Sequence, residues 1–244
     1  MRITLDGVRF RGDGSKALFT VANGALKGWF ESPGVRRNDE PRPLGDGAFT
    51  APTFRSGRSV SWSGLILTKT PDEQRHAMEQ LAGVCSGESL SRLTVQHESH
   101  ATWADVQIMQ PPEVTVEAYG RVARYDVELW APDPRRYGEL RSFPNGTNVY
   151  HRGNAPAFPV VRIGWGRASY DITWQGRTFR VSGAPSGGVH RVDMRTGLLT
   201  RNGVPVLGAV VRAETSALPP GARWSYAVSG DATGVTVEVH DTFF

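Results

Sequence analysis

Apolar and polar residues alternate along much of this chain, and this period of two constrains its fold more than any other feature. Tyr170, Ile172 and Trp174 take every second position up to Gln175–Gly176, and the alternation resumes in residues 177–181. Alternation at period two places one set of side chains on each face of a β-strand. A Gln-Gly pair between two such runs is typical of a tight hairpin turn. The sequence therefore predicts a mainly β protein.

The same pattern recurs along the chain with regular turn signals. Asn202–Gly203 lies between two short apolar runs, and residues 231–234 separate two alternating segments near the end. Residues 114–122 alternate in one phase and residues 125–129 in the other, which predicts a bulge or a turn around residues 119–120. Short strands with turns every 8–12 residues are the pattern of a β-sandwich or barrel, which we expect in the second half.

One helix interrupts the β pattern after residue 70. Thr70 supplies an N-cap hydroxyl, a proline follows at the first helical position, and Glu73 lies three residues after the cap. This arrangement is a capping box at a helix start. The apolar stripe comprises Ala77, Met78, Leu81 and Ala82, and we expect it to pack against a sheet, with Gly83 or Gly87 ending the helix.

Length and composition favour two ordinary globular domains. The 244 residues are 39% hydrophobic and 21% charged, which is a folded balance. The single cysteine, Cys85, excludes an intramolecular disulfide and fits assembly in a reducing cytoplasm. No signal peptide or membrane-spanning run is evident, so we expect a soluble protein without membrane insertion. The proline-rich segment 131–138 predicts a domain boundary, with domains at 1–134 and 139–244.

Charge is uneven between the two halves. Residues 1–138 hold 17 basic and 17 acidic residues, whereas residues 139–244 hold 11 arginines and 7 acids, which accounts for the net charge of +4 (11 − 7). These arginines alternate singly with apolar residues, as solvent-facing strand positions do. Nucleic-acid binders usually gather their basic residues into stripes, so specific binding to nucleic acid is disfavoured.

Residues 31–47 form a long polar stretch rich in proline, glycine and arginine. Loops of this length are uncommon in compact domains unless they bind something or are ordered by a partner. We therefore hold open two interpretations of this segment, a partner-contacting loop and a solvated one.

The residues that could carry chemistry predict no catalytic, cofactor-binding or metal site. His97 and His100 follow a predicted strand, where a spacing of three places them on opposite faces, and we expect turn or surface histidines. No nucleophile elbow, phosphate loop or dinucleotide fingerprint occurs; Gly164–Gly166 starts like the last of these without continuing it. Most of the seven tryptophans alternate with valine or isoleucine, so packing is favoured over a sugar-stacking platform.

Several motifs in fixed order resemble the siphophage distal tail protein family. The N-terminal ones are residues 47–52, residues 58–66 and the capped helix with Leu81, followed by residues 125–134, which resemble the closing strand of that family's first domain. Residues 154–163 are similar to the strand that opens the family's second domain, and further matches lie at 193–194, 202–203 and 218–221. Each motif is loose, and their order over nearly the whole chain carries the resemblance.

The resemblance implies a fold and a function. It implies an N-terminal ring-forming β-barrel or sandwich domain with one helix, followed by a C-terminal galectin-like β-sandwich. Six copies would form a ring at the end of the tail tube of a long-tailed phage. That homohexamer would contact the tail tube protein and the tail-associated hub protein, and would leave a lumen through which DNA passes without specific binding. The protein would be part of the virion, assembled in the host cytoplasm, and would not be an enzyme.

Two other classes of protein stay open at this point. A carbohydrate-binding module contacting the host surface would use the same kind of sandwich, with exposed tryptophans stacking on sugars. A glycoside hydrolase would need two carboxylates about 5–10 Å apart in a cleft. Sugar binding that depends on individual tryptophans would favour the first class, and the lack of such a carboxylate pair would exclude the second.

Overall fold

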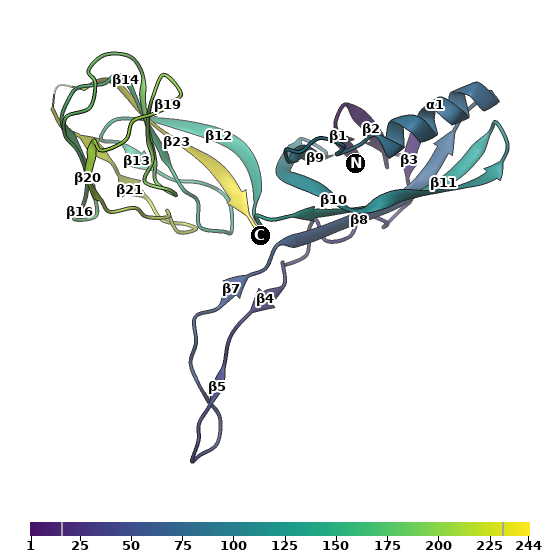
Figure 1. Ribbon diagram of the computed structural model, residues 1–244, viewed down its shortest axis with the longest axis horizontal. Helices are drawn as coiled ribbons and strands as arrows, with labels where there is room; N and C mark the ends of the chain where they lie inside the picture. Colours follow the sequence, from purple (N-terminus) through teal and green to yellow (C-terminus); the bar gives the residue numbers. More distant parts are fainter. Residues whose placement is uncertain (16, 231) are drawn as a thin grey trace. The chain divides into compact units, whose positions relative to one another are not determined.

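The computed structural model describes residues 1–15, 17–230 and 232–244, which divide into two compact units (Figure 1). The first unit comprises Met1–Arg136 together with Phe244, and the second comprises Tyr137–Phe243. Both consist mainly of β-strands, and α1 (Pro71–Ala82) is the one helix of the described residues. The prediction of a mainly β protein with one helix is confirmed. Independent folding of the two predicted domains stays a prediction.

Seven strands of the first unit form a closed barrel. These strands are β1 (Arg2–Leu5), β2 (Val8–Arg11), β3 (Phe19–Val21), β8 (Arg58–Leu67), β9 (Ser91–His97), β10 (His100–Ala118) and β11 (Val122–Ala131). Their order is β11-β8-β3-β2-β1-β9-β10, and β10 also pairs with β11, which closes the wall. The pair β2–β3 is parallel and the other pairs are antiparallel. Closure satisfies strand edges that would otherwise be open.

Aromatic rings fill part of the barrel interior. The Phe10 ring lies 5.3 Å from the ring of Phe19, 5.3 Å from that of Trp62 and 5.7 Å from that of Tyr125, measured between centroids. All four side chains are buried, and they come from β2, β3, β8 and β11. Tilted and edge-on contacts of this kind add to the free energy gained from burying the rings. The inward phase of the predicted alternation therefore becomes the core.

Gly64 allows β3 and β8 to approach closely. A Cβ atom at Gly64 would lie 1.7 Å from the carbonyl oxygen of Thr20, so any larger residue would push the two strands apart. The same carbonyl accepts a hydrogen bond of 2.7 Å from the Tyr125 hydroxyl. A buried tyrosine hydroxyl needs a partner, and the small residue at position 64 lets this one reach it.

The helix begins as the sequence predicts. The Thr70 hydroxyl accepts a hydrogen bond from the Glu73 backbone N–H, and the Glu73 carboxylate accepts one from the Lys69 N–H. The reciprocal bond thus goes to the residue before the cap. Gly83 caps the helix at its C-terminal end, which confirms the nearer of the two predicted stops.

The buried face of α1 differs in part from the predicted stripe. Ala77 and Leu81 are buried, whereas Met78 is half-buried and Ala82 is exposed. Gln74 is the third buried residue, and its side chain bonds to the turn between β10 and β11. The prediction for Ala82 is wrong, because the buried face runs through Gln74, Ala77 and Leu81 and leaves Ala82 outside it.

Two substitutions test this face of the helix. Leu81→Ala should lower the free energy of unfolding by roughly 2–5 kcal/mol, because it leaves a cavity at a site that is fully buried. Thr70→Ala should cost roughly 0.5–2 kcal/mol, because it removes one cap acceptor near the surface. Urea unfolding of both variants gives the comparison. A milder effect of Leu81→Ala than of Thr70→Ala would contradict the burial of α1 against the barrel.

The second unit is a β-sandwich. Its first sheet runs in the order β12 (Arg136–Pro144), β23 (Thr233–Phe243), β14 (Val160–Trp165), β17 (His190–Asp193), β18 (Leu199–Arg201), β19 (Val204–Pro205). Its second sheet runs in the order β20 (Val210–Ala213), β16 (Arg177–Val181), β15 (Tyr170–Trp174), β22 (Ala227–Val228), and β13 (Asn148–Val149) pairs with β21 (Trp224–Ser225). Apolar residues from both sheets form one buried cluster, as the alternation predicts.

The predicted turns occupy their expected places. Gln175–Gly176 joins β15 to β16 and Asn202–Gly203 joins β18 to β19, with positive φ at all four residues. The phase change near residue 123 follows a turn at Tyr119–Gly120 between β10 and β11, which confirms that prediction. The predicted turn at 231–234 includes Asp231, which lies outside the described residues.

Candidate functional site: an extended arm and its anchor

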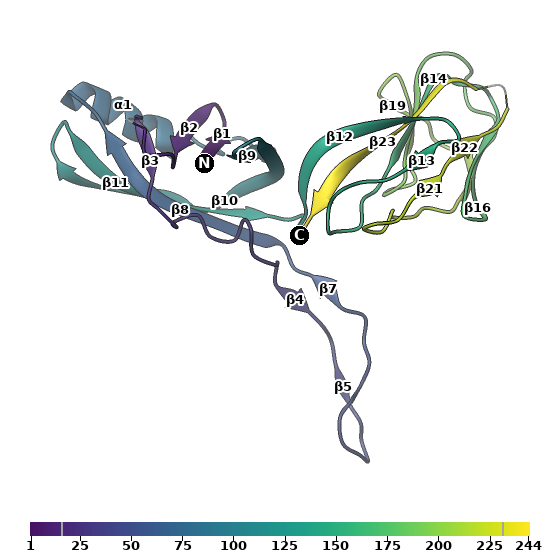
Figure 2. The ribbon, with the colours of Figure 1, turned by 180° about the vertical axis from the view of Figure 1, so that it is seen from behind.

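Residues 31–57 leave the barrel as a long narrow hairpin, which we call the arm (Figures 1 and 2). Near its base β4 (Val35–Arg36) pairs with β7 (Phe54–Arg55), and further out β5 (Glu40–Pro41) pairs with β6 (Ala48–Phe49). The long polar loop predicted at 31–47 is thus the first strand and the tip of this hairpin. The segment is extended because its strands pair with residues 48–55, beyond the predicted loop.

The arm exposes apolar side chains that have no core of their own to enter. Val35, Phe49 and Phe54 are each more than half exposed, and Leu44 at the tip is fully exposed. A two-stranded hairpin without a third layer is marginally stable in water. Large apolar groups on such an element indicate a surface that another molecule covers. This favours the partner-contacting interpretation of the segment over the solvated one.

Arginine side chains lie over the aromatic rings of the arm. The Arg36 guanidinium is 5.8 Å from the centroid of the Phe54 ring, and Arg42 is 5.8 Å from that of Phe49. Each pair spans the two strands of the hairpin, since Arg36 faces Phe54 directly in the β4–β7 register. Exposed cation–π contacts contribute about 0.5–1 kcal/mol each. They help hold the hairpin together without burying it.

Arg58 anchors the base of the arm. This residue begins β8 and is 2% exposed. Its Nη1 donates to the carbonyl oxygens of Gly28, Trp29 and Glu31, the last two at 2.9 and 2.8 Å. Its Nε donates to the Pro134 carbonyl at 3.1 Å. One guanidinium therefore joins the chain entering the arm to the segment that follows β11.

Burial dominates the electrostatics of this anchor. Burial and, to a smaller extent, the nearby charge of Arg136 lower the pKa of Arg58, Glu31 acts in the opposite direction, and the net result is a pKa of about 10. Arg58 therefore stays charged at neutral pH. Burying a charge is costly unless it is well hydrogen-bonded, and the four carbonyl oxygens satisfy Nε and Nη1, while Nη2 is buried without a hydrogen-bond acceptor.

Arg136 forms the other half of the anchor. Its guanidinium lies 5.7 Å from the Trp29 ring centroid and 5.5 Å from that of Phe30, and its Nη2 donates to the backbone oxygen of Phe244 at 2.8 Å. Burial lowers the pKa of Arg136, and Glu31 opposes that shift. The last residue of the chain is thereby held beside the residues at the base of the arm.

Truncating Arg58 should loosen the arm before it unfolds the barrel. Arg58→Ala strands several carbonyl oxygens and should lower the free energy of unfolding by roughly 2–4 kcal/mol. Trypsin should also cut faster at Arg36–Arg37, which limited proteolysis followed by mass spectrometry measures. The exposed Arg124, paired with Glu117, gives a matched control for which Arg→Ala should cost at most about 1 kcal/mol. Equal effects of both variants would show that Arg58 anchors nothing.

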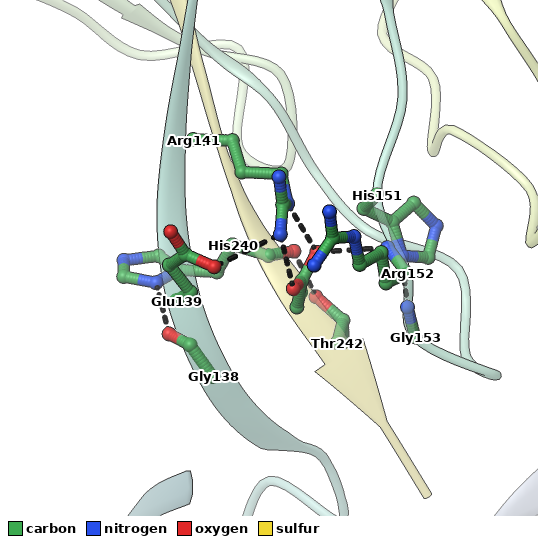
Figure 3. Close-up of polar contacts among 9 residues, drawn as sticks. Gly138, Glu139, Arg141, His151, Arg152, Gly153, His240 and Thr242 are labelled. Atoms are coloured by element: carbon green, nitrogen blue, oxygen red, sulfur yellow. Dashed lines mark hydrogen bonds and ion pairs between the residues drawn. The ribbon is translucent and has the colours of Figure 1, made fainter. Parts of the chain in front are cut away.

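The second unit holds a buried ion pair in a polar cluster (Figure 3). Arg141 on β12 donates from Nε to the Asp241 carboxylate on β23 at 3.0 Å, and the Arg152 backbone N–H donates to the same carboxylate at 2.8 Å. Burial alone would raise the pKa of Asp241, but these hydrogen bonds and the charge of Arg141 outweigh it and keep the pKa below its usual value. The contacts join two strands and a loop, which is a stabilising arrangement.

Two buried histidines complete the polar interior of the sandwich. His151 Nε2 lies 3.3 Å from the Leu218 carbonyl oxygen, and its Nδ1 accepts from the Gly153 N–H at 3.1 Å. His190 Nε2 lies 3.0 Å from the Pro185 carbonyl oxygen. Burial lowers the pKa of both rings, although their carbonyl partners oppose that shift. Both histidines are therefore held neutral inside the fold.

This burial gives the protein a specific pH dependence. Because both pKa values are lower in the folded state than in the unfolded chain, the unfolded chain takes up protons first as the pH falls. Stability should be constant above about pH 7.5 and fall below about pH 6.5, by at most about 1.4 kcal/mol per pH unit for each histidine. Urea unfolding between pH 5 and 8 measures this slope, and His151→Gln with His190→Gln should flatten it. Stability that rises on acidification would contradict the assignment.

His97 and His100, singled out from the sequence, lie on the surface of the first unit. They lie opposite each other across the turn between β9 and β10, which confirms the prediction of turn or surface histidines; because the turn separates them, they do not share one strand. Within residues 1–15, 17–230 and 232–244, no cluster of His, Cys, Asp and Glu is suited to a metal ion. Cys85 is partly buried, and burial raises the pKa of its thiol.

The two alternative classes of protein also receive little support. Asp241 is the one buried acid among the described residues, and Arg141 pairs with it at 3.0 Å and with the exposed Glu139 at 2.9 Å, so an arginine lies between these two carboxylates, where a glycosidase would hold the sugar. Trp29, Trp62 and Trp174 are in the cores, as the packing interpretation predicts. Trp165 is the most exposed of the tryptophans and is the residue that a sugar-stacking interpretation would invoke.

Sequence reasoning missed the anchor and the buried ion pair, although one signal was present for both. Arg58 has the same phase along β8 as the buried Val60 and Trp62. Asp241 likewise has the phase of buried valines along β23. A charged residue in the inward phase of a strand indicates a buried, partnered charge.

In the described residues, no helix is both long and apolar enough to span a membrane.

Comparison with known proteins defines the class of fold. Neither a protein-family model nor a curated protein sequence matches the chain. Among solved structures, it is similar to SPP1 Dit, described as a paradigm of the hub adsorption apparatus in phages that infect Gram-positive bacteria. That likeness has a TM-score of 0.77 and 13% sequence identity, and covers 100% of this chain and 99% of the other. The chain therefore has the fold of a phage tail hub protein.

Chains of the phage P2 baseplate share the fold more distantly. The baseplate in its activated conformation with calcium gives a TM-score of 0.52 at 9% identity, covering 100% of this chain and 97% of the other. The form with strontium gives 0.52 at 10% identity, covering 99% and 96%. The resemblance to siphophage distal tail proteins, drawn from the order of motifs, is thus confirmed for the fold.

Proposed function

We propose that this protein is a structural component of the tail tip of a long-tailed phage. In this proposal six copies form a ring at the distal end of the tail tube, connect the tube to the hub or baseplate, and leave a lumen for DNA. The observation that carries it is the likeness to SPP1 Dit over the full length of both chains. Function inferred from a shared fold is an analogy, so the proposal also rests on what this chain exposes.

The arm supplies the physical reason for assembly. It carries exposed apolar and arginine side chains, and its few cross-strand pairs give it no core. Covering it with the barrel of another copy would bury these groups without disturbing the closed wall. Such a contact joins two different surfaces, so it is head-to-tail and closes into a ring when the rotation between copies is a whole fraction of a turn.

The remaining parts of the proposal follow from the ring. The tail tube protein would contact one face and the tail-associated hub protein the other, while DNA passes through without specific binding. Residues 1–134 would be the assembly domain, and residues 139–244 would fold independently as a galectin-like sandwich. The protein would be assembled in the host cytoplasm and become part of the virion without an enzymatic role.

The mass of the assembly tests the proposal. Six chains of 26.7 kDa give about 160 kDa, and light scattering across a concentration series should approach that value. Negative-stain microscopy of the same samples should show rings. A protein that stays monomeric at the highest concentration, with no ring in isolated virions, would rule out the proposed function.

Two further samples locate the assembly surface. Replacing residues 33–56 with a short Gly-Ser linker should abolish the ring, while the melting transition of the barrel stays cooperative. Residues 137–243 expressed alone should be monomeric and folded. If the arm-deleted protein still formed rings, the contact between copies would have to lie elsewhere on the barrel.

A further inference from the structure

A hollow lies between α1 and the end of the β10–β11 hairpin. It has a volume of about 360 Å³. Its apolar lining comprises Pro71, Met78, Val116 and Tyr119, and its charged rim comprises Asp72, Arg75 and Glu79. The Tyr119 side chain is 82% exposed. We call this hollow the α1 groove.

The α1 groove is held open by hydrogen bonds beneath it. The buried Gln74 side chain accepts from the Gly120 N–H at 2.8 Å and donates to the Ala118 carbonyl oxygen at 3.3 Å. Gly120 has φ of +71°, and a Cβ there would lie 2.9 Å from the Pro71 ring. The hairpin end is thus fixed against the helix. A preformed groove binds with less loss of conformational entropy than a flexible one.

The tip of the arm presents chemistry that matches this groove. The Arg42 backbone N–H donates to the Gly47 carbonyl oxygen at 3.1 Å. This hydrogen bond closes the loop at the tip of the arm, and Leu44 is one of the loop residues. Leu44 is fully exposed, with Arg42 two residues before it and Asp46 two residues after it. One apolar side chain is therefore flanked by one positive and one negative charge.

We propose that Leu44 of one copy inserts into the α1 groove of a second copy. Leu44 would contact Met78, Val116 and Tyr119. Arg42 and Asp46 would lie against the charged rim, where Arg75 pairs with Asp72 at 3.7 Å and with Glu79 at 3.1 Å. A rim that carries both signs of charge can meet both Arg42 and Asp46, which adds specificity to the apolar contact. This inference rests on the proposed function, because it identifies the surfaces that close the ring.

The geometry favours a second copy over the same chain. In both views the arm runs away from α1, so the tip does not lie near its own groove (Figures 1 and 2). The tip lies 14 residues from Arg58, and an extended chain of that length spans up to about 45 Å. The 12-residue α1 is only about 18 Å long. The arm is thus long enough to reach a neighbouring barrel.

Cross-linking between copies tests the contact directly. In a Cys85→Ser background, Gly45→Cys places a thiol beside the tip and Glu79→Cys places one on the rim of the groove. Both positions are exposed, and Gly45 has open space around its Cα. A short bismaleimide linker should yield a ladder of covalent species up to six chains. Leu207→Cys, on an exposed leucine of the second unit, replaces Glu79→Cys in the matched control and should yield no ladder.

Substitutions on both sides of the contact give a second measurement. Leu44→Asp and Tyr119→Ala should each raise the concentration for half-assembly at least tenfold, whereas Leu44→Met should change it less than threefold. The double variant should need a concentration for half-assembly little higher than that of either single variant. If Leu44 and Tyr119 touch, either substitution alone already removes the contact, so the two effects do not add. Circular dichroism melts should be unchanged in all of them.

The outcomes separate this inference from the proposed function. Rings that form normally with Leu44→Asp, or that yield no ladder from the Gly45–Glu79 pair, would overturn the groove assignment and leave the ring in place. A cross-link confined to single chains would show that the arm binds its own barrel. A wild-type protein that never assembles would overturn both proposals.

Discussion

The buried guanidinium of Arg58 is the interaction on which the first unit depends most. Its hydrogen bonds reach the residues that enter the arm and the segment that leaves β11, so two parts of the chain far apart in sequence are fixed by one side chain. A buried charge is tolerable only when most of its donors find acceptors. The base of the arm is therefore held where its backbone carbonyl oxygens can accept hydrogen bonds from the buried Arg58 side chain.

The arm and the barrel represent opposite solutions to the problem of strand edges. The barrel closes on itself through the second pairing of β10 with β11, so its wall resists unwanted association. The arm keeps open edges and exposed apolar side chains outside that wall. In the proposed assembly, association would be directed to this one surface, which a specific partner can cover.

The second unit uses its buried polar groups for stability. The charge of Asp241 is balanced by Arg141, and burial lowers the pKa of His151 and His190 against the opposing effect of their carbonyl partners. Catalytic groups are typically left poised beside a substrate space. Here each of these groups forms a hydrogen bond or an ion pair with a neighbour inside the sandwich, which agrees with a structural role. The likeness to SPP1 Dit at 13% identity shows that the fold is shared although few residues are the same.

Local signals in the sequence were sufficient for the elements that depend on nearby residues. The cap at Thr70 and the turns at Gln175–Gly176 and Asn202–Gly203 formed where expected, because hydrogen bonds and φ preferences within a few residues decide them. The alternation also identified which side chains enter the cores.

Only the tertiary structure decided how these elements are used. Arg58 and Asp241 share the phase of buried residues, but their partners lie up to 100 residues away, beyond the reach of any local pattern. The arm was unrecognised as a hairpin because its strands are two residues long and pair across the tip. By itself the sequence determined strands, turns and their inward faces, since these depend on short-range geometry. The closed barrel, the buried charges and the exposed arm depend on long-range contacts, which exist only once the chain has folded.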